Sequence, residues 1–186
     1  LPLAIELAAA RMKLLSPEAL LTRLDQPLHV LTSGPRDVVA RQQTLRNTIE
    51  WSYQLLDAQE QQLFRRLSVF IGGCTLEAIE ALYTSLGDEA EFILDTVTSL
   101  ADKSLLQRIE QQAVQEPRFA MLETIREYAL ESLAANGETE AARRAHAGYF
   151  LRLSEEAEQG MAGPQQAVLL ERLEQEHDNL REALEW

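Results

Sequence analysis

Cysteine, positive charge and long apolar runs are all scarce in this sequence of 186 residues. The single cysteine, Cys74, excludes an intramolecular disulfide, and no apolar run approaches the roughly 18 residues that a membrane-spanning helix needs. Only 17 Lys and Arg residues stand against 30 Asp and Glu residues, which gives a formal net charge of −13. This charge would repel a duplex or an anionic membrane unless a local basic patch reversed it. We therefore expect a cytoplasmic chain that binds no membrane.

The motifs of common catalytic sites are also missing. The sequence contains no G-x-x-x-x-G-K-[ST] or G-x-G-x-x-G phosphate-binding loop and no G-x-S-x-G nucleophile elbow. Cys74 follows Gly73 at an expected helix start, where a thiol pKa can fall. No histidine lies near it in the sequence, however, and we interpret it as a buried structural residue. The chain by itself is therefore predicted not to be an enzyme, and no catalytic residue is assigned.

A metal site is not indicated either. The three histidines, His29, His146 and His177, are far apart in the sequence, and there is no pair of cysteines. The segment Glu176-His177-Asp178 contains ligand-type side chains, but neighbours in a helix do not face a common point. We interpret this segment as a solvated junction between helices and each histidine as an ordinary surface or packing residue.

What is present is an ordinary globular composition, 46% hydrophobic and 25% charged, with helical periodicity over most of the chain. Residues 3–15 are rich in Ala and Leu, and Ser16-Pro17 has the residue types that begin a second, short helix. The segment 32–37 is the clearest loop of the first half and is taken as a domain boundary. Because the sequence begins and ends within helical patterns, we expect it to be a piece of a longer protein.

The middle of the chain predicts helices followed by a β-hairpin. Helical spacing and capping residues predict helices that begin near residue 45, after Asp57 and after Thr75, and a fourth over 89–102. Two short extended candidates, 104–109 and 118–122, follow, with a polar loop between them. This order is typical of a winged-helix domain. The apolar positions that give the helical spacing are Leu45, Ile49, Tyr53, Leu56, Leu63, Phe64, Leu67, Ile93, Val97 and Leu100.

Beyond the hairpin the chain is predicted to be entirely helical. A helix over 123–135 ends at Asn136-Gly137, and further helices are expected over 138–159, 164–174 and 178–186. The expected fold class is therefore mainly α. Its three parts are the C-terminal helices of a helical subdomain (1–36), a winged-helix domain with a small β-hairpin (37–136), and the start of a region of helical-hairpin repeats similar to tetratricopeptide repeats (137–186).

Four segments together resemble a known family. Residues 1–11 resemble the Gly-Leu-Pro-Leu motif of signalling P-loop NTPases without its glycine, and residues 44–56 resemble the first winged-helix helix of bacterial members. Residues 64–73 resemble the segment that follows this helix, and residues 118–129 are similar to the Met-His-Asp region. On these segments the chain resembles bacterial signalling ATPases of the STAND and NB-ARC type, including transcriptional regulators that end in a LuxR-type DNA-binding domain.

The resemblance implies a nucleotide-dependent switch that controls transcription. In the family, an upstream P-loop domain binds ATP or ADP with Mg²⁺, and the winged helix folds back on the nucleotide to hold the inactive, ADP-bound state. The repeats that follow sense a protein or small-molecule inducer. The implied partners of this chain are therefore the P-loop domain and the later repeats of the same protein. The implied cofactors, ADP or ATP with Mg²⁺, belong to the longer protein, whose ATPase activity stays open, and none is expected for this chain.

Few residues carry over from the family. Leu1, Pro2 and Leu3 would line the adenine side of the nucleotide pocket in the longer protein, although Pro2 also suits the first turn of a helix. The Met-His-Asp positions are occupied by Met121, Leu122 and Glu123. The chain departs from the family here, because a leucine cannot donate a hydrogen bond to a phosphate. Glu123 would hold the hairpin to the next helix, or it is simply a carboxylate favoured at a helix start.

DNA binding is the main alternative to this switch. A winged helix can place its recognition helix in the major groove, where Lys and Arg contact phosphates and base edges. We expect no direct DNA binding by this chain, because the helix in that position has only Lys103 as its nearest base and carries the acids Glu89, Glu91, Asp95 and Asp102. Two alternatives stay open: a DNA-binding winged-helix transcriptional regulator with a helical dimerisation tail, and a plain helical protein-interaction scaffold.

Overall fold

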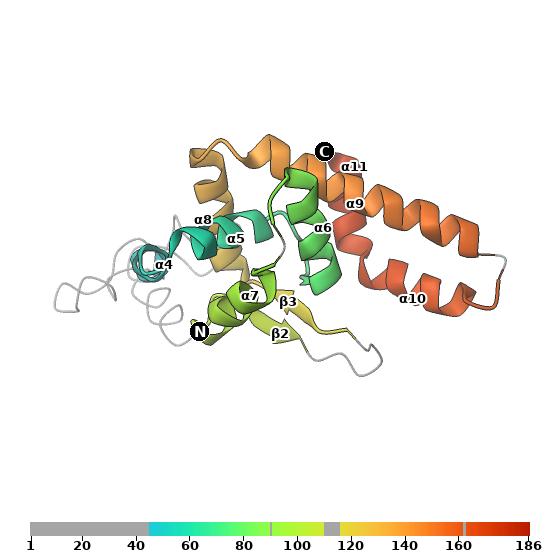
Figure 1. Cartoon of the computed structure of the whole chain (residues 1–186), viewed down its shortest axis with the longest axis horizontal. Coiled ribbons are helices and arrows are strands. Elements are labelled where there is room, and N and C mark those ends of the chain that lie inside the picture. The colour runs from blue at the N-terminus through green and yellow to red at the C-terminus, as the bar shows by residue number, and fades with distance from the viewer. Residues whose placement is uncertain (1–44, 90, 110–115, 162) are drawn as a thin grey trace, which may run out of the picture.

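The computed structural model describes residues 45–89, 91–109, 116–161 and 163–186. The described part is mainly helical, with one small sheet (Figure 1). The helices predicted before residue 45, the loop 32–37, His29 and the candidate residues Leu1, Pro2 and Leu3 lie outside it. In chain order the elements are α4 (Leu45–Gln54), α5 (Ala58–Leu67), β1 (Cys74–Thr75), α6 (Leu76–Leu86), α7 (Ile93–Asp102), β2 (Gln107–Ile109), β3 (Arg118–Ala120), α8 (Glu123–Ala135), α9 (Thr139–Gly160), α10 (Gln166–Gln175) and α11 (His177–Glu185).

The helix starts predicted from capping residues are confirmed. Asp57 accepts a hydrogen bond from the Glu60 backbone N–H at 2.9 Å, and the Glu60 carboxylate accepts one from the Asp57 backbone N–H at 2.8 Å, so α5 begins with a capping box. Thr75 caps α6 through the backbone N–H of Ala78 at 3.2 Å. These contacts satisfy N–H groups that the first turn of a helix leaves without partners.

The helix predicted over 89–102 begins later than expected, at Ile93. Gly87, with a φ of 80°, ends α6 in the left-handed conformation, and the backbone N–H of Asp88 bonds back to the carbonyl of Tyr83. The chain therefore needs several residues to leave this cap before a new helix can start. Glu89 and Glu91 consequently lie in the connection between α6 and α7 rather than in α7.

The sheet has the order β1-β3-β2 with antiparallel pairing throughout. Phe119 at the middle of β3 lies opposite Cys74 on one side and Arg108 on the other. The predicted hairpin is confirmed, but both predicted strands are too long: the first begins at Gln107 rather than at residue 104, and the second ends at Ala120 rather than at residue 122. Leu105 and Leu106 are instead buried in the turn that ends α7, where both backbone N–H groups bond to the carbonyl of Leu100. Strand β1 was not predicted, because two residues are too few to show an alternating pattern.

One hydrophobic core runs through the winged helix and into the C-terminal helices. Phe64 on α5 is fully buried and lies near the rings of Tyr53 and Tyr128, with ring centroids 5.4 and 6.4 Å away. Most of the apolar positions predicted from helical spacing are confirmed as buried: Ile49, Leu56, Leu63, Phe64, Leu67, Ile93, Val97 and Leu100. Tyr53 is partly buried against this core.

Of the C-terminal helices, α9 and α11 pack against the winged helix, whereas α10 packs mainly against α9 and α11. The long helix α9 packs across α6 and also contacts α8, α10 and α11 (Figure 1). It buries a stripe that includes Tyr149, Phe150 and Leu153. The predicted bounds of these helices agree with the structure to within two residues, and α8 matches its prediction at both ends. Among the described residues, no helix has the length and hydropathy needed to cross a membrane.

Candidate interaction surface of the winged helix

Helix α7 holds the position of a recognition helix, because it follows α5 and α6 and directly precedes the β2–β3 hairpin. Ile93, Val97 and Leu100 face the core, which turns the opposite side of α7 outward. This outer side exposes Leu94, at 57% of its surface, and Asp95. The surface available to a partner of α7 therefore begins at these residues and continues into the connection that precedes the helix.

The outer side of α7 is negatively charged. Four carboxylates on and just before the helix are exposed and form no hydrogen bond or ion pair with another described residue; they are Glu89, Glu91, Asp95 and Asp102. Among the described residues, the base beside them is Lys103, which is paired with the buried carboxylate of Glu60; this carboxylate also accepts a hydrogen bond from Ser99 Oγ at 2.5 Å. The Lys103 ammonium is therefore already engaged inside the domain.

The electrostatics of Glu60 support this pairing. Burial acts to raise the pKa of its carboxyl, but the hydrogen bonds from Lys103, Ser99 and the Asp57 backbone outweigh it and hold the pKa below its usual value. Glu60 thus stays ionised and ties the start of α5 to the end of α7.

Two arginines of α5, the helix that packs against α7, are also engaged. Arg65 is buried, with a guanidinium nitrogen 2.5 Å from Glu138 Oε1 and another 2.9 Å from the Tyr53 hydroxyl. Arg66 is buried as well, pairs with Asp88 at 2.5 Å, and lies over the Tyr83 ring. In the described part of the β2–β3 hairpin, Arg108 is the exposed base. A single arginine is far from the cluster of cations that phosphate binding requires.

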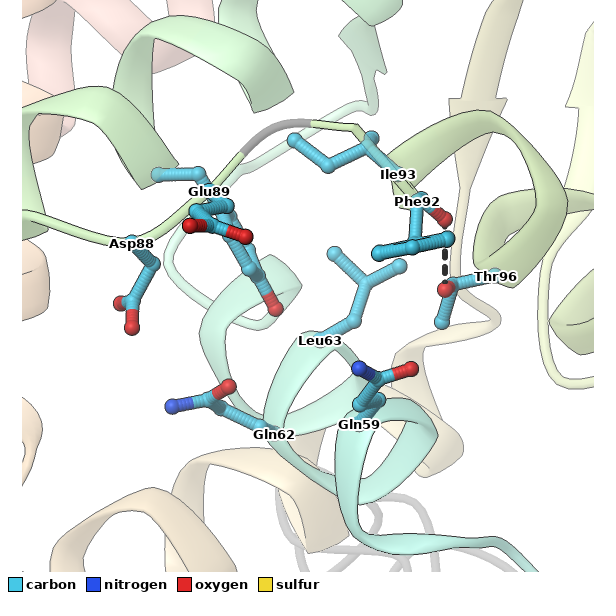
Figure 2. A pocket seen from close by; sticks show the side chains of 9 residues that line it. Gln59, Gln62, Leu63, Asp88, Glu89, Phe92, Ile93 and Thr96 are labelled. Carbon is cyan, nitrogen blue, oxygen red and sulfur yellow. Dashed lines mark hydrogen bonds between the residues drawn. The ribbon is translucent and has the colours of Figure 1, made fainter.

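A hollow of about 270 Å³ opens between α5 and the start of α7. Figure 2 shows Gln59, Gln62 and Leu63 of α5 on one side and the residues from the start of α7 and its preceding connection on the other. The ring of Phe92 at its rim is 50% exposed. Glu89 adds one of the free carboxylates, so the hollow combines apolar and acidic groups.

The three residues at the Met-His-Asp positions lie where β3 leads into α8. Met121 packs against the core, while Leu122 is 44% exposed and its carbonyl accepts the backbone N–H groups of Ile125 and Arg126, each at 2.9 Å. The Glu123 carboxylate bonds to Arg126 at 2.8 and 3.1 Å, and Arg126 also reaches the carbonyl of Ser68 at 3.2 Å. Glu123 therefore stands in the first turn of α8 with a partner on the same helix. A role of these three residues toward a nucleotide stays a prediction.

A buried polar network, which was not predicted from the sequence, joins the hairpin to the C-terminal helices. The side chain of Arg118 on β3 is buried, pairs with Glu176 at the junction of α10 and α11, and donates to the carbonyl of Gly73 at 2.9 Å. Asn179 on α11 is fully buried, donates to Gly73 O at 2.9 Å and to Glu176 Oε2 at 2.8 Å, and accepts from the Ile71 backbone N–H at 2.7 Å.

The network corrects the interpretation of residues 176–178 as a solvated junction. Glu176 is only 4% exposed, whereas its neighbours His177 and Asp178 are exposed. The helical pattern could not reveal this, because the partner of Glu176 lies 58 residues earlier in the chain. Burial of such a pair depends on how α11 docks, which is a tertiary property.

His146 is a packing residue, as predicted. Its ring lies between Phe70 and Phe150, with centroids 5.1 and 4.7 Å away, and its Nε2 is 3.5 Å from Asn179 Oδ1. Burial lowers the pKa of His146 from 6.5 to about 4, with a smaller contribution from Arg143, and the Asn179 contact only partly opposes this. The ring is therefore neutral at pH 7. No group of three or more metal-ligating side chains occurs in the described ranges.

The neutral state of His146 predicts a pH-dependent loss of stability. Between about pH 6.5 and pH 4 the unfolded chain binds a proton that the folded protein does not, so stability falls as the pH is lowered through this window. Between pH 7 and pH 5 the wild-type protein should lose about 2 kcal/mol more unfolding free energy than His146→Leu. Urea denaturation at both pH values measures this difference. The exposed His177→Leu should behave as wild type, and an equal loss in all three proteins would contradict the assignment.

Cys74 is buried on β1, as predicted. Burial raises the pKa of its thiol, and the nearby Arg118 guanidinium opposes this only in part. The lowered pKa that a helix start can produce is therefore not realised, because burial dominates the environment of the thiol. A buried, protonated thiol is not a nucleophile.

Comparison with known families and proteins also points to a winged helix in the middle of the chain. Residues 56–134 match the model described as a winged helix-turn-helix domain. Over all 186 residues the chain is 41% identical to proteins of Mycobacterium tuberculosis and Mycobacterium bovis, each named "Putative HTH-type transcriptional regulator". The chain spans only 21% of their length. It is also 36% identical over 141 residues, 75% of the chain and 35% of the relative, to an "Uncharacterized protein" of Mycobacterium tuberculosis.

Proposed function

We propose that this chain, whose residues 56–134 form a winged helix-turn-helix domain, is a regulatory segment of a longer transcription regulator and that its winged helix contacts protein rather than DNA. The homology to HTH-type transcriptional regulators supports the first part of the proposal. The second part rests on one observation: the outer side of α7 presents free carboxylates, while Lys103 beside it is bound to Glu60. A surface of this sign opposes the phosphates of a duplex.

Direct DNA binding by this winged helix is the second candidate function. It is favoured by the description of the matched domain and by the names of the relatives, which refer to the helix-turn-helix. In that case the hairpin, with the exposed Arg108, would have to supply the phosphate contacts that α7 lacks. The relatives are about five times longer than this chain, so their helix-turn-helix need not be the segment that corresponds to it.

A nucleotide-dependent switch is a finer form of the proposal. It is supported by the four segments that resemble signalling ATPases, whereas the matched domain and the names of the relatives refer to no nucleotide. Leu122 offers no side-chain donor to a phosphate, and the nearby guanidinium of Arg126 is bound to Glu123. In this form of the proposal, the winged helix holds the inactive arrangement through contacts with the upstream domain rather than through Leu122.

Fluorescence anisotropy with labelled duplex DNA tests whether the winged helix binds DNA. At physiological salt the chain should bind a pool of random duplexes with a Kd no tighter than about 10⁻⁴ M, the weak end of nonspecific binding. The variant Asp95→Lys/Asp102→Lys reverses the charge on the outer side of α7 and should bind more tightly, with a steeper salt dependence. Nanomolar, salt-sensitive binding by the wild-type chain to a selected duplex would instead establish the DNA-binding alternative.

A further inference from the structure

We propose that the hollow between α5 and the start of α7, together with the exposed side chains around it, docks a basic amphipathic segment of a partner protein. This inference rests on the proposed function, since it names the chemistry of the protein that contacts the winged helix. The docking surface is defined here as Gln59, Gln62, Glu89, Glu91, Phe92 and Leu94.

The apolar part of the docking surface is open to a side chain from outside. The base of the hollow is formed by Leu63 and Ile93, which are 1% and 3% exposed and belong to the core. Phe92 stands at its edge with 50% of its surface exposed (Figure 2), and Leu94, two residues further along the chain, is 57% exposed. An aliphatic or aromatic side chain in the hollow would cover Phe92, and neighbouring apolar side chains of the same segment could reach Leu94; both contacts remove apolar surface from water.

The polar part of the docking surface selects positive charge. Glu89 and Glu91 are exposed and have no hydrogen-bond or ion-pair partner among the described residues, and Asp95 continues the same charge along α7. Asp88, which also lines the hollow, is already paired with Arg66. Lys or Arg side chains on the segment would complement the free carboxylates, and the amide groups of Gln59 and Gln62 can bond to a guanidinium or to peptide groups.

The combination of the two parts identifies the occupant. A nucleic acid would bring phosphates against the free carboxylates, and a second copy of this chain would bring a net charge of −13. A basic segment without apolar residues would leave Phe92 and Leu94 exposed. A basic amphipathic segment satisfies both requirements, and its apolar side chains would enter the hollow while its cations face the acids.

Selection from a random dodecapeptide library displayed on phage tests the proposal. The full chain is the bait, and the variant Glu89→Lys/Phe92→Ser is used for counter-selection. Both altered side chains are exposed, and serine suits the N-cap position that Phe92 occupies, so the variant should fold. The matched control, Leu151→Ser/Glu155→Lys, makes the same two changes at exposed positions of α9. Circular dichroism and thermal melting confirm that both variants are folded.

The enriched peptides should carry net positive charge and at least one large apolar residue. They should bind the wild-type chain and the α9 control equally, and bind Glu89→Lys/Phe92→Ser at least tenfold more weakly. Added salt should weaken their binding to the wild-type chain. Neutral or acidic peptides, no enrichment, or binding unchanged by the double substitution would overturn the proposal while leaving the proposed function untouched. A dimer in sedimentation that is lost only in Glu89→Lys/Phe92→Ser would assign the surface to a second copy instead. The proposed function itself fails if duplex DNA displaces the peptides.

Discussion

Replacing Arg118 by methionine is expected to lower the free energy of unfolding by about 3–5 kcal/mol. The substitution removes the partner of Glu176 and leaves a carboxylate that is 4% exposed without its opposite charge. It also removes a hydrogen bond to the carbonyl of Gly73. Burial of an unpaired charge costs far more than the loss of an exposed ion pair, because water can no longer solvate it. Urea denaturation monitored by circular dichroism measures the loss.

Two control variants separate the buried charge from the loss of an arginine side chain. Arg118→Met/Glu176→Gln removes the unpaired charge and keeps an acceptor for Asn179, so it should recover more than half of the stability. Arg144→Met breaks the exposed pair with Glu140 on α9 and should change stability by less than about 0.5 kcal/mol. If the double variant is as unstable as Arg118→Met alone, the loss comes from packing and the electrostatic explanation is wrong.

The second large effect is expected at Gly73, where the chain turns from α5 into β1. Gly73 has a φ of 94°, and a Cβ there would lie 2.7 Å from the carbonyl oxygen of Phe119 and 3.1 Å from the Cβ of Ala120 on β3. Gly73→Ala therefore adds backbone strain and forces β1 and β3 apart, at the carbonyl that Arg118 and Asn179 also use. We expect a loss of about 2–5 kcal/mol, the sum of a left-handed backbone and an overpacked contact.

Gly87 is the matched control for Gly73. Its φ is 80°, but a Cβ there would meet nothing within 4 Å. Gly87→Ala should therefore cost only the backbone strain, about 1–2 kcal/mol. Chemical denaturation of the two variants side by side measures the steric share at Gly73. Equal losses would mean that β3 can move away from residue 73 at little cost, and that the turn has room for a side chain.

The features that the sequence predicted well are those with local causes. The capping box of Asp57 and Glu60, the Thr75 cap and the bounds of α8 depend on residues within one or two turns of each other, so the sequence contains the whole signal. The same holds for the apolar stripe of α7, which turns its acidic side outward. The sequence therefore predicted that the helix in the recognition position is negatively charged, which opposes binding to a DNA duplex.

The candidate site was only partly predictable for the same reason. The acids around α7 could be read directly, but the hollow beside Phe92 depends on how α5 packs against the start of α7. The engagement of Lys103 by Glu60, 43 residues earlier, likewise follows from that packing. The sequence assigned Met121, Leu122 and Glu123 to the Met-His-Asp positions but did not reveal that Arg126 binds the carboxylate of Glu123.

The sequence by itself determined the helices, their caps, the hairpin and the acidic character of this winged helix, because periodicity and capping are read within a few residues. Only the tertiary structure decided that β1 joins the sheet and that Arg118 and Glu176 are buried together with Asn179. A two-residue strand has no pattern of its own, and a buried charge is stable only where a partner from a distant part of the chain is placed beside it. The docking of α11 on the hairpin supplies that partner.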